Sequence, residues 1–233
     1  MTDNSLKQKR IVVPTKDAES WKALLADPDK HWRSGYSAMS TAYSWEDANG
    51  LPKEVEQLFR TAENPALRDA ELALAIPEYK VALTGGSRPS QNDVFAILTC
   101  SAGIISMMVE GKAREQFDDQ LGDWKKRTSP NGAEARLTEI MSCIGITDPI
   151  PDSIRYQLLH RAASAVIEAK RFHANFAVLL IQSFVDNDSE NHYDEFEKFL
   201  GLFKKTALKN TLIEISNPSG LHLYAAWVQS KAT

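Results

Sequence analysis

The chain has 233 residues, of which 43% are hydrophobic and 25% are charged, as in an ordinary soluble protein. No repeat or low-complexity tract divides it, so we expect a single domain over residues 1–233. No run of about 18 apolar residues occurs, and the first twenty residues carry charges and no apolar core of signal-peptide length. We therefore expect a cytoplasmic protein with no membrane partner.

The net charge of −4 gives no general attraction to nucleic acid, so any such binding depends on local patches. Two short basic runs are candidates, Lys125–Arg127 and Lys204–Lys205 with Lys209, although runs of this kind are more often solvated helix ends. Cys100 and Cys143 are the two cysteines, and we expect both to be free, buried thiols. The composition argues against a large nucleic-acid footprint but not against a small site.

Residues 11–14 predict a short strand that Pro14 ends, and Thr15–Leu25 predicts a helix with Thr15 or Asp17 at its N-cap. An aromatic stretch follows, which favours core packing over stacking on bases; it comprises Trp32, Tyr36, Tyr43 and Trp45.

Pro52 opens a helix that continues to about Ala62, and Ala66–Ile76 predicts a second helix. Glu54 shares the apolar stripe of the first of these helices, although a glutamate in a first turn is also favoured by the helix dipole alone.

Three short apolar runs then follow one another, and they predict two hairpins or one three-stranded meander: Tyr79–Leu83, Val94–Cys100 and Ile104–Val109. Asp93 stands at the entrance of the second strand, and the third runs into Glu110-Gly111-Lys112. Side chains alternate along a strand, so Lys112 points to the same side as Glu110.

Two carboxylates and a lysine at the ends of adjacent strands are suited to metal-dependent cleavage of a phosphodiester. Asp93 and Glu110 offer hard oxygens to Mg²⁺, and Lys112 can orient the attacking water and offset charge on the phosphate. By itself the pattern also suits a hairpin with a solvated, charged end, and both interpretations stay open at this point.

After Lys112 the apolar spacing predicts helices in Ala113–Arg127 and, beyond the break at 129–132, around Leu137–Ile144. Ser153–Phe172 predicts the longest helix, with an apolar face opposite a polar stripe of Gln157, His160, Arg161, Ser164 and Glu168. We expect Ser164 and Glu168 to face solvent. Gln157, His160 and Arg161 either do the same or contact phosphate.

The segment Asn175–Val185 predicts a strand buried on both faces and added to the meander after the helical crossover. Tyr193–Phe203 predicts a helix, and Leu212–Ile215 with Leu221–Val228 predicts a closing hairpin. We expect this tail to cover the sheet or to form a contact of a homodimer.

The pattern resembles the PD-(D/E)XK nuclease superfamily, and more closely an uncharacterised bacterial family within it. The stretches that carry the resemblance are 89–93 (PSQND), 109–112 (VEGK), 154–161 (IRYQLLHR) and 223–228 (LYAAWV). The resemblance implies a restriction-endonuclease-like α/β (α+β) core over about residues 51–186, in the order helix, three strands, helix, strand, with an extension over 187–233. One departure is visible, because Asn92 rather than proline precedes the aspartate.

The resemblance also implies the roles of single residues. Asp93 falls on the second strand of the core, Glu110 and Lys112 fall on the third, and the implied cofactor is Mg²⁺ or Mn²⁺. Asp93, Glu110 and the carbonyl of Gly111 are then the expected metal ligands. Glu54 is the candidate for the extra acid that the first helix supplies in such enzymes.

Two functions from different classes remain. The first is a Mg²⁺-dependent nuclease in which Asp93, Glu110 and Lys112 are catalytic and Gln157, His160 and Arg161 assist at the phosphate. The second is a non-catalytic protein of the same fold that acts as a binding or assembly module, which the acidic charge favours. A small-molecule enzyme on another α/β fold has no support, because no Gly-rich phosphate loop, nucleophile elbow or zinc motif occurs.

Overall fold

The computed structural model of the chain describes residues 11, 15–185, 192–217 and 220–231. Within this part of the chain the centre is an open mixed sheet of six strands in the order β1-β2-β3-β4-β6-β5. The strands are Glu71–Val81 (β1), Ser90–Cys100 (β2), Gly103–Lys112 (β3), Phe176–Ser183 (β4), Ile213–Ser216 (β5) and His222–Gln229 (β6). The expected fold class, a central mixed sheet flanked by helices, is confirmed.

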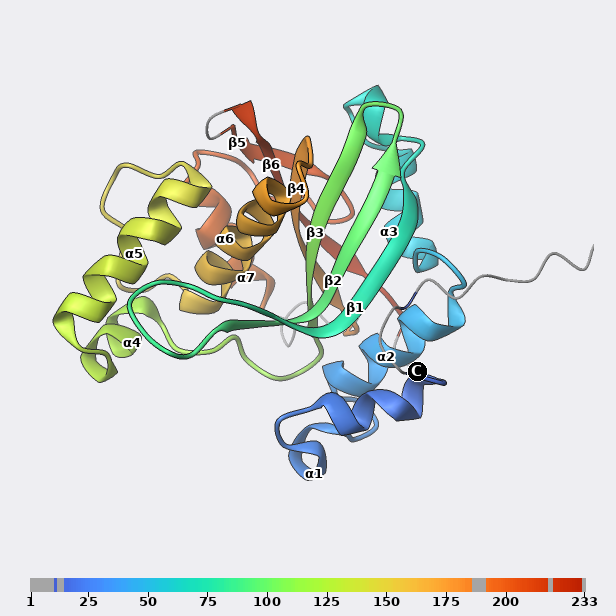
Figure 1. The fold of residues 1–233 in the computed structure, drawn as a ribbon, viewed down its shortest axis with the longest axis horizontal. Helices are drawn as coiled ribbons and strands as arrows, with labels where there is room; N and C mark the ends of the chain where they lie inside the picture. Colours follow the sequence, from blue (N-terminus) through green and yellow to red (C-terminus); the bar gives the residue numbers. More distant parts are fainter. Residues whose placement is uncertain (1–10, 12–14, 186–191, 218–219, 232–233) are drawn as a thin grey trace, which may run out of the picture.

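Helices cover both faces of this sheet (Figure 1). One face carries α4 (Leu121–Arg127), α5 (Pro130–Ile144), α6 (Tyr156–Arg171) and α7 (Tyr193–Gly201). The other carries α2 (Ser37–Asp47) and α3 (Lys53–Arg60), with the short helices η1 (Ala18–Leu24), α1 (Pro28–His31) and η2 (Pro65–Leu67) nearby. No helix in the described residues is both long and apolar enough to cross a lipid bilayer.

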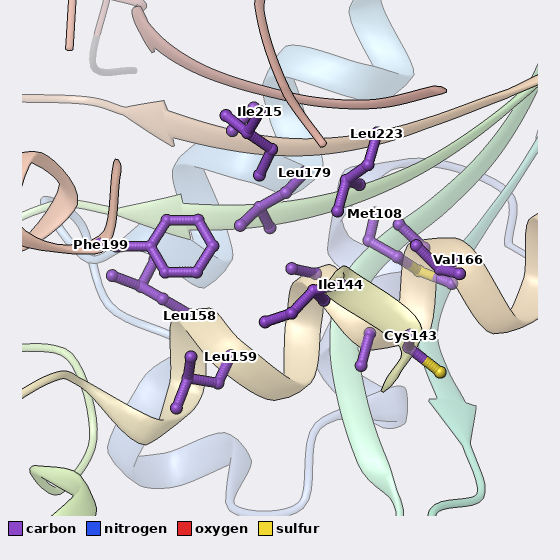
Figure 2. Close-up of a cluster of buried hydrophobic side chains, with 14 of the residues drawn as sticks. Met108, Cys143, Ile144, Leu158, Leu159, Val166, Leu179, Phe199, Ile215 and Leu223 are labelled. Atoms are coloured by element: carbon purple, nitrogen blue, oxygen red, sulfur yellow. The ribbon is translucent and has the colours of Figure 1, made fainter. Parts of the chain in front are cut away.

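The α6 face of the sheet holds the larger hydrophobic core. Figure 2 shows side chains of α6 and α5, among them Leu158, Val166 and Ile144, gathered with Leu179 of β4 and Leu223 of β6. Cys143 lies in the same cluster as a buried free thiol, whereas Cys100 is free but half-buried. The opposite face buries α2 and α3 against the alternate residues of the strands.

The predicted helix over Ala66–Ile76 is wrong, because β1 begins at Glu71 and occupies most of that segment. Alanine, leucine and glutamate favour helices locally, which is why the segment resembles one. Pairing with β2 overrides this preference, as in Leu72 opposite Leu98 and Ala75 opposite Ala96.

The expected strands are also longer than their apolar runs. β2 begins at Ser90, so Asp93 lies inside the strand and not at its entrance. β3 continues through Lys112, because the parallel neighbour β4 pairs with it as far as Lys112 opposite Ser183. The polar residues of interest are therefore held in a hydrogen-bonded sheet.

Several helical predictions need smaller corrections. Asp17 caps the first helix as one of the two expected residues, but that helix is a 3-10 helix beginning at Ala18. Of Ala113–Arg127 only α4 is helical, and the long helix begins at Tyr156. Of the expected strand at 11–14, Ile11 forms an isolated bridge with Ala75, and residues 12–14 lie outside the described residues.

The C-terminal hairpin is present as β5 and β6, and its strands extend the sheet, whereas α7 of the same tail packs on the α6 face. β6 lies inside the sheet, parallel to β4 from the pair Phe176–His222 to the pair Ser183–Gln229. β5 pairs with its other edge and ends the sheet. The apolar residues of β4 are buried on both faces, as predicted for this strand.

Candidate functional site

Asp93 and Glu110 lie at the same end of the sheet on neighbouring antiparallel strands. The pair Val94–Val109 places them at the next position of the ladder, and both side chains point to the α6 face. The Asp93 Oδ2 atom accepts a hydrogen bond of 2.7 Å from the backbone N–H of Gly111. Lys112 lies on the same face, as the period of the strand predicted.

The Glu110 carboxylate is the centre of a buried polar network. Arg161 Nε donates to its Oε2 at 2.6 Å, and Gln157 Nε2 donates to its Oε1 at 2.8 Å. Lys112 Nζ lies 3.0 Å from Oε1 and donates to Gln157 Oε1 at 3.0 Å. The side chain of Lys112 is 5% exposed, so it is not a solvated residue at a strand end.

The polar stripe of α6 faces the sheet and not the solvent. Gln157, His160 and Arg161 are all buried in or beside the network around Glu110. The expectation that Ser164 and Glu168 face solvent is wrong. Ser164 Oγ donates to the carbonyl of His160, and Glu168 accepts from the hydroxyl of Tyr79, so packing against the sheet satisfies both.

Ser90, at the start of β2, connects the two basic side chains of α6. Its Oγ lies 2.8 Å from Nδ1 of His160 and 3.2 Å from Nη1 of Arg161. Arginine only donates, so Ser90 accepts from Arg161 and gives its own proton to His160 Nδ1. His160 therefore carries its proton on Nε2 when it is neutral.

Glu78 is a third acid of the site that the sequence analysis missed. It lies on β1 opposite Asp93, between the pairs Pro77–Val94 and Tyr79–Asn92. Gln91 Nε2 donates to its Oε2 at 2.5 Å. Its φ of 52° is unusual for a residue with a side chain, and such strain is frequent at functional sites. An acid directly before the first predicted strand was the available signal.

Charge and burial perturb the acids of this cluster strongly. Burial, together with the negative charges of Glu110 and Glu78, raises the pKa of Asp93 well above its ordinary value. Burial also raises the pKa of Glu78 to about 7. Burial alone would raise the pKa of Glu110, but Arg161 and Lys112 more than offset it and lower that pKa. The surroundings therefore favour the ionised form of Glu110, whereas they favour the protonated form of Asp93.

The basic side chains of α6 are perturbed by the same surroundings. Burial, followed by the charge of Arg161, lowers the pKa of His160 well below its usual range, so this histidine is neutral at pH 7. Burial would lower the pKa of Arg161, but the carboxylates of Glu110 and Asp93 raise it, so Arg161 stays charged.

Position 111 requires a glycine because helix α2, on the other face of the sheet, lies close to it. A Cβ at this position would lie 2.2 Å from Thr41 Oγ1 and 3.4 Å from Ser37 Cβ, both on α2. Thr41 Oγ1 is buried and has no hydrogen-bond partner within the described part of the chain. The glycine of Glu-Gly-Lys therefore lets α2 approach β3 behind the two charged residues.

Glu54 is not among the residues that the structure brings together here. It lies half-buried in the first turn of α3, a helix that packs against β6. The groups that mainly shift the pKa values of Asp93 and Glu110 do not include it. Of the two basic runs, Lys125–Arg127 ends α4 and forms surface ion pairs with Asp152, Asp123 and Asp119.

The aromatic stretch near the N-terminus belongs mainly to the second core. Trp45 is buried there, and its Nε1 donates to Gln182 Oε1 of β4 at 3.0 Å. Trp32 and Tyr43 pack against the same cluster, whereas Tyr36 is exposed. The expectation of core packing holds for three of these four side chains.

The donors that could hold a cation are all oxygens. They are the carboxylates of Glu78, Asp93 and Glu110 and the carbonyl of Gly111, which suit a hard ion such as Mg²⁺ that keeps most of its waters. In the described residues no group of three or more His, Cys, Asp or Glu side chains is arranged so that it could hold a metal ion. A cation would relieve the mutual repulsion of the acids, but it would share Glu110 with Lys112 and Arg161.

Comparison with known proteins adds one finding. A family model described as a domain of unknown function (DUF6946) matches residues 14–232 of the chain. No curated protein and no solved structure matches it.

Proposed function

The chain belongs to this DUF6946 family, and from the geometry of its own residues we propose that it is a Mg²⁺- or Mn²⁺-dependent nuclease of the PD-(D/E)XK type. One observation carries the proposal: Asp93, Glu110 and Lys112 meet on one face of two adjacent strands, buried under α6. Keeping ionisable groups together in a protein interior is costly, and acids with strongly perturbed pKa values are typical of catalytic and cation-binding sites.

In this proposal Asp93, Glu110 and the carbonyl of Gly111 would hold the cation, and Glu78 would replace Glu54 as the additional acid. When bound, the cation supplies positive charge against the charge that grows on the phosphate. A bound cation would favour the ionised forms of Asp93 and Glu78, because ligating carboxylates must be ionised.

The remaining side chains position the attacking water and stabilise the charge on the phosphate. Lys112 orients the attacking water and stabilises the phosphate in the transition state. Gln157 holds both Lys112 and Glu110 and so fixes their separation. Arg161 donates to Glu110 through its Nε alone. Other N–H groups of its guanidinium can therefore bind a phosphate oxygen. We place this enzyme in the cytoplasm with nucleic acid as its substrate, and a homodimer is compatible with it.

A second function, a non-catalytic binding or assembly module, is favoured by one specific observation. Glu110 is already neutralised by Arg161 and Lys112 and hydrogen-bonded by Gln157 without any cation. A network satisfied in this way stabilises the junction of α6 with the sheet by itself.

Calorimetry with Mn²⁺, followed by cleavage assays, separates the two functions. We expect weak binding of Mn²⁺ and a rise in melting temperature, both lost in Asp93→Asn and kept in Asp29→Asn, an exposed control. Lys112→Met should keep the Mn²⁺ binding but lower the cleavage of single- or double-stranded nucleic acid by about a hundredfold or more. Lys53→Met, which removes an exposed lysine, should change neither.

The contrary outcomes are distinct. No heat and no thermal shift with saturating Mn²⁺ would assign the chain to the non-catalytic function. Equal cleavage by the wild type and Lys112→Met would refute the role of the lysine.

A further inference from the structure

A cavity of about 680 Å³ lies beside the proposed catalytic residues. The loop between β1 and β2, the end of α4 and the first turns of α6 line it, and Figure 1 shows that loop reaching across toward α4 and α5. Ser90, His160 and Arg161 belong both to the cavity wall and to the network around Glu110. The cavity therefore opens directly onto the basic side of the site.

Arg136 of α5 places a buried positive charge in the wall of this cavity. Its Nε donates to the carbonyl of Thr84, and its Nη2 donates to the carbonyls of Leu83 and Gly86. No carboxylate pairs with it anywhere in residues 15–185, 192–217 and 220–231. These carbonyl oxygens accept hydrogen bonds from Nε and Nη2 of Arg136 but carry no net charge, so the positive charge of Arg136 attracts an anion to the wall.

His160 contributes a directed donor to the same space. Ser90 holds its Nδ1, and no partner of its Nε2–H is found over the described ranges. The ring is neutral because burial and the nearby Arg161 lower its pKa. His160 lies in the wall of the cavity, so an oxygen of a bound ligand could accept a hydrogen bond from this N–H.

The remainder of the wall determines which anion fits. Four arginines and two aspartates line the cavity, and one of the aspartates, Asp119, is paired with Arg127. Trp124 is partly exposed and stacks on Tyr156, with ring centroids 4.0 Å apart. The cavity is larger than a phosphate ion needs, so it has room for a larger anion. The aromatic side chain in its wall can stack on a nucleic-acid base.

We propose that this cavity binds one nucleotide of a nucleic-acid strand, with its phosphate on Arg136, Arg161 and His160 and its base against Trp124. The proposal that this nucleotide lies next to the scissile bond rests on the proposed function. Arg161 then links the two sites, because it touches Glu110 on one side and the nucleotide phosphate on the other.

The test uses calorimetry in EDTA, so that neither metal binding nor cleavage contributes. We expect adenosine 5′-monophosphate to bind more tightly than inorganic phosphate, and adenosine to bind least. A trinucleotide with a terminal phosphate should bind more tightly than the mononucleotide. The indole N–H signal of Trp124, assigned with Trp124→Phe, should shift on binding in an NMR titration of the full chain.

His160→Leu should lower the affinity for adenosine 5′-monophosphate roughly tenfold or more, the scale of one hydrogen bond to a charged group. His31→Leu, which removes an exposed histidine of α1, should leave it unchanged.

Equal affinity for adenosine and its monophosphate, or an unmoved Trp124 signal, would overturn the proposal even if His160→Leu failed to fold. A trinucleotide that binds no more tightly than the mononucleotide would overturn its assignment to a strand. Failure here leaves the Mn²⁺ and cleavage tests intact, because those are independent of the cavity.

Discussion

Replacing Glu78 by glutamine should change how the stability of the protein depends on pH. The folded-state pKa of Glu78 is raised to about 7 by burial, from an ordinary value of 4.5. Its stabilising contribution is therefore fully present below pH 4.5 and is lost as the pH rises through 7, because the folded state binds the proton more tightly than the unfolded state does.

The magnitude follows from this shift. Between pH 5 and pH 8 the wild type loses up to about 1.4 kcal/mol per pH unit through this group, or about 2.5 kcal/mol in total. The neutral amide in Glu78→Gln has no charge to lose, and it keeps the neighbouring Gln91 as a hydrogen-bond partner. The free energy of unfolding of the variant, relative to wild type, should therefore rise by about 2.5 kcal/mol from pH 5 to pH 8.

Urea unfolding at pH 5 and pH 8 measures this difference, with the slope m checked for constancy. Glu71→Gln, an exposed glutamate on the same strand, is the matched control and should show no comparable change. If the difference between Glu78→Gln and wild type is the same at both pH values, Glu78 is ionised normally in the folded state, and its inclusion in the site is wrong.

Two further predictions concern the packing around Glu110. Gly111→Ala should destabilise the protein by about 1–3 kcal/mol in urea unfolding, because the added methyl group collides with Thr41 of α2; an unchanged midpoint would contradict the close approach of that helix. Arg161→Met should cost about 3–5 kcal/mol at pH 7, since it leaves Glu110 buried with Lys112 as its remaining charged partner. The loss in Arg161→Met should shrink as the pH falls and Glu110 becomes protonated, and a loss independent of pH would argue that shape alone is affected.

The order of strands and helices around the site followed from local pattern. Turn residues at 84–90 and 101–103 separated the strands, and strict alternation placed Glu110 and Lys112 on one side of β3. The apolar face of α6 could be predicted for the same reason, since the spacing of its apolar residues depends on helix geometry alone.

Features that depend on contacts between residues distant in sequence could not be predicted from the sequence pattern. Glu71–Ile76 has helix-forming residues, and only its pairing with β2 makes it a strand, so Glu78 could not be placed opposite Asp93. The burial of Ser164 and Glu168 depends equally on the sheet against which α6 packs. Sequence periodicity distinguishes a polar stripe from an apolar one, but it does not say whether the polar stripe faces water or a buried network.

The position of β6 has a consequence for how the protein is made. β4 is apolar on both faces and needs a partner on each edge, yet its neighbour β6 comes after all the other strands of this sheet in the sequence. Until residues 222–229 have left the ribosome, the nascent chain holds an open, hydrophobic strand edge beside the strand that carries Glu110. A fragment ending near residue 186 contains every proposed catalytic side chain, but that edge of β4 is unpaired and prone to aggregation.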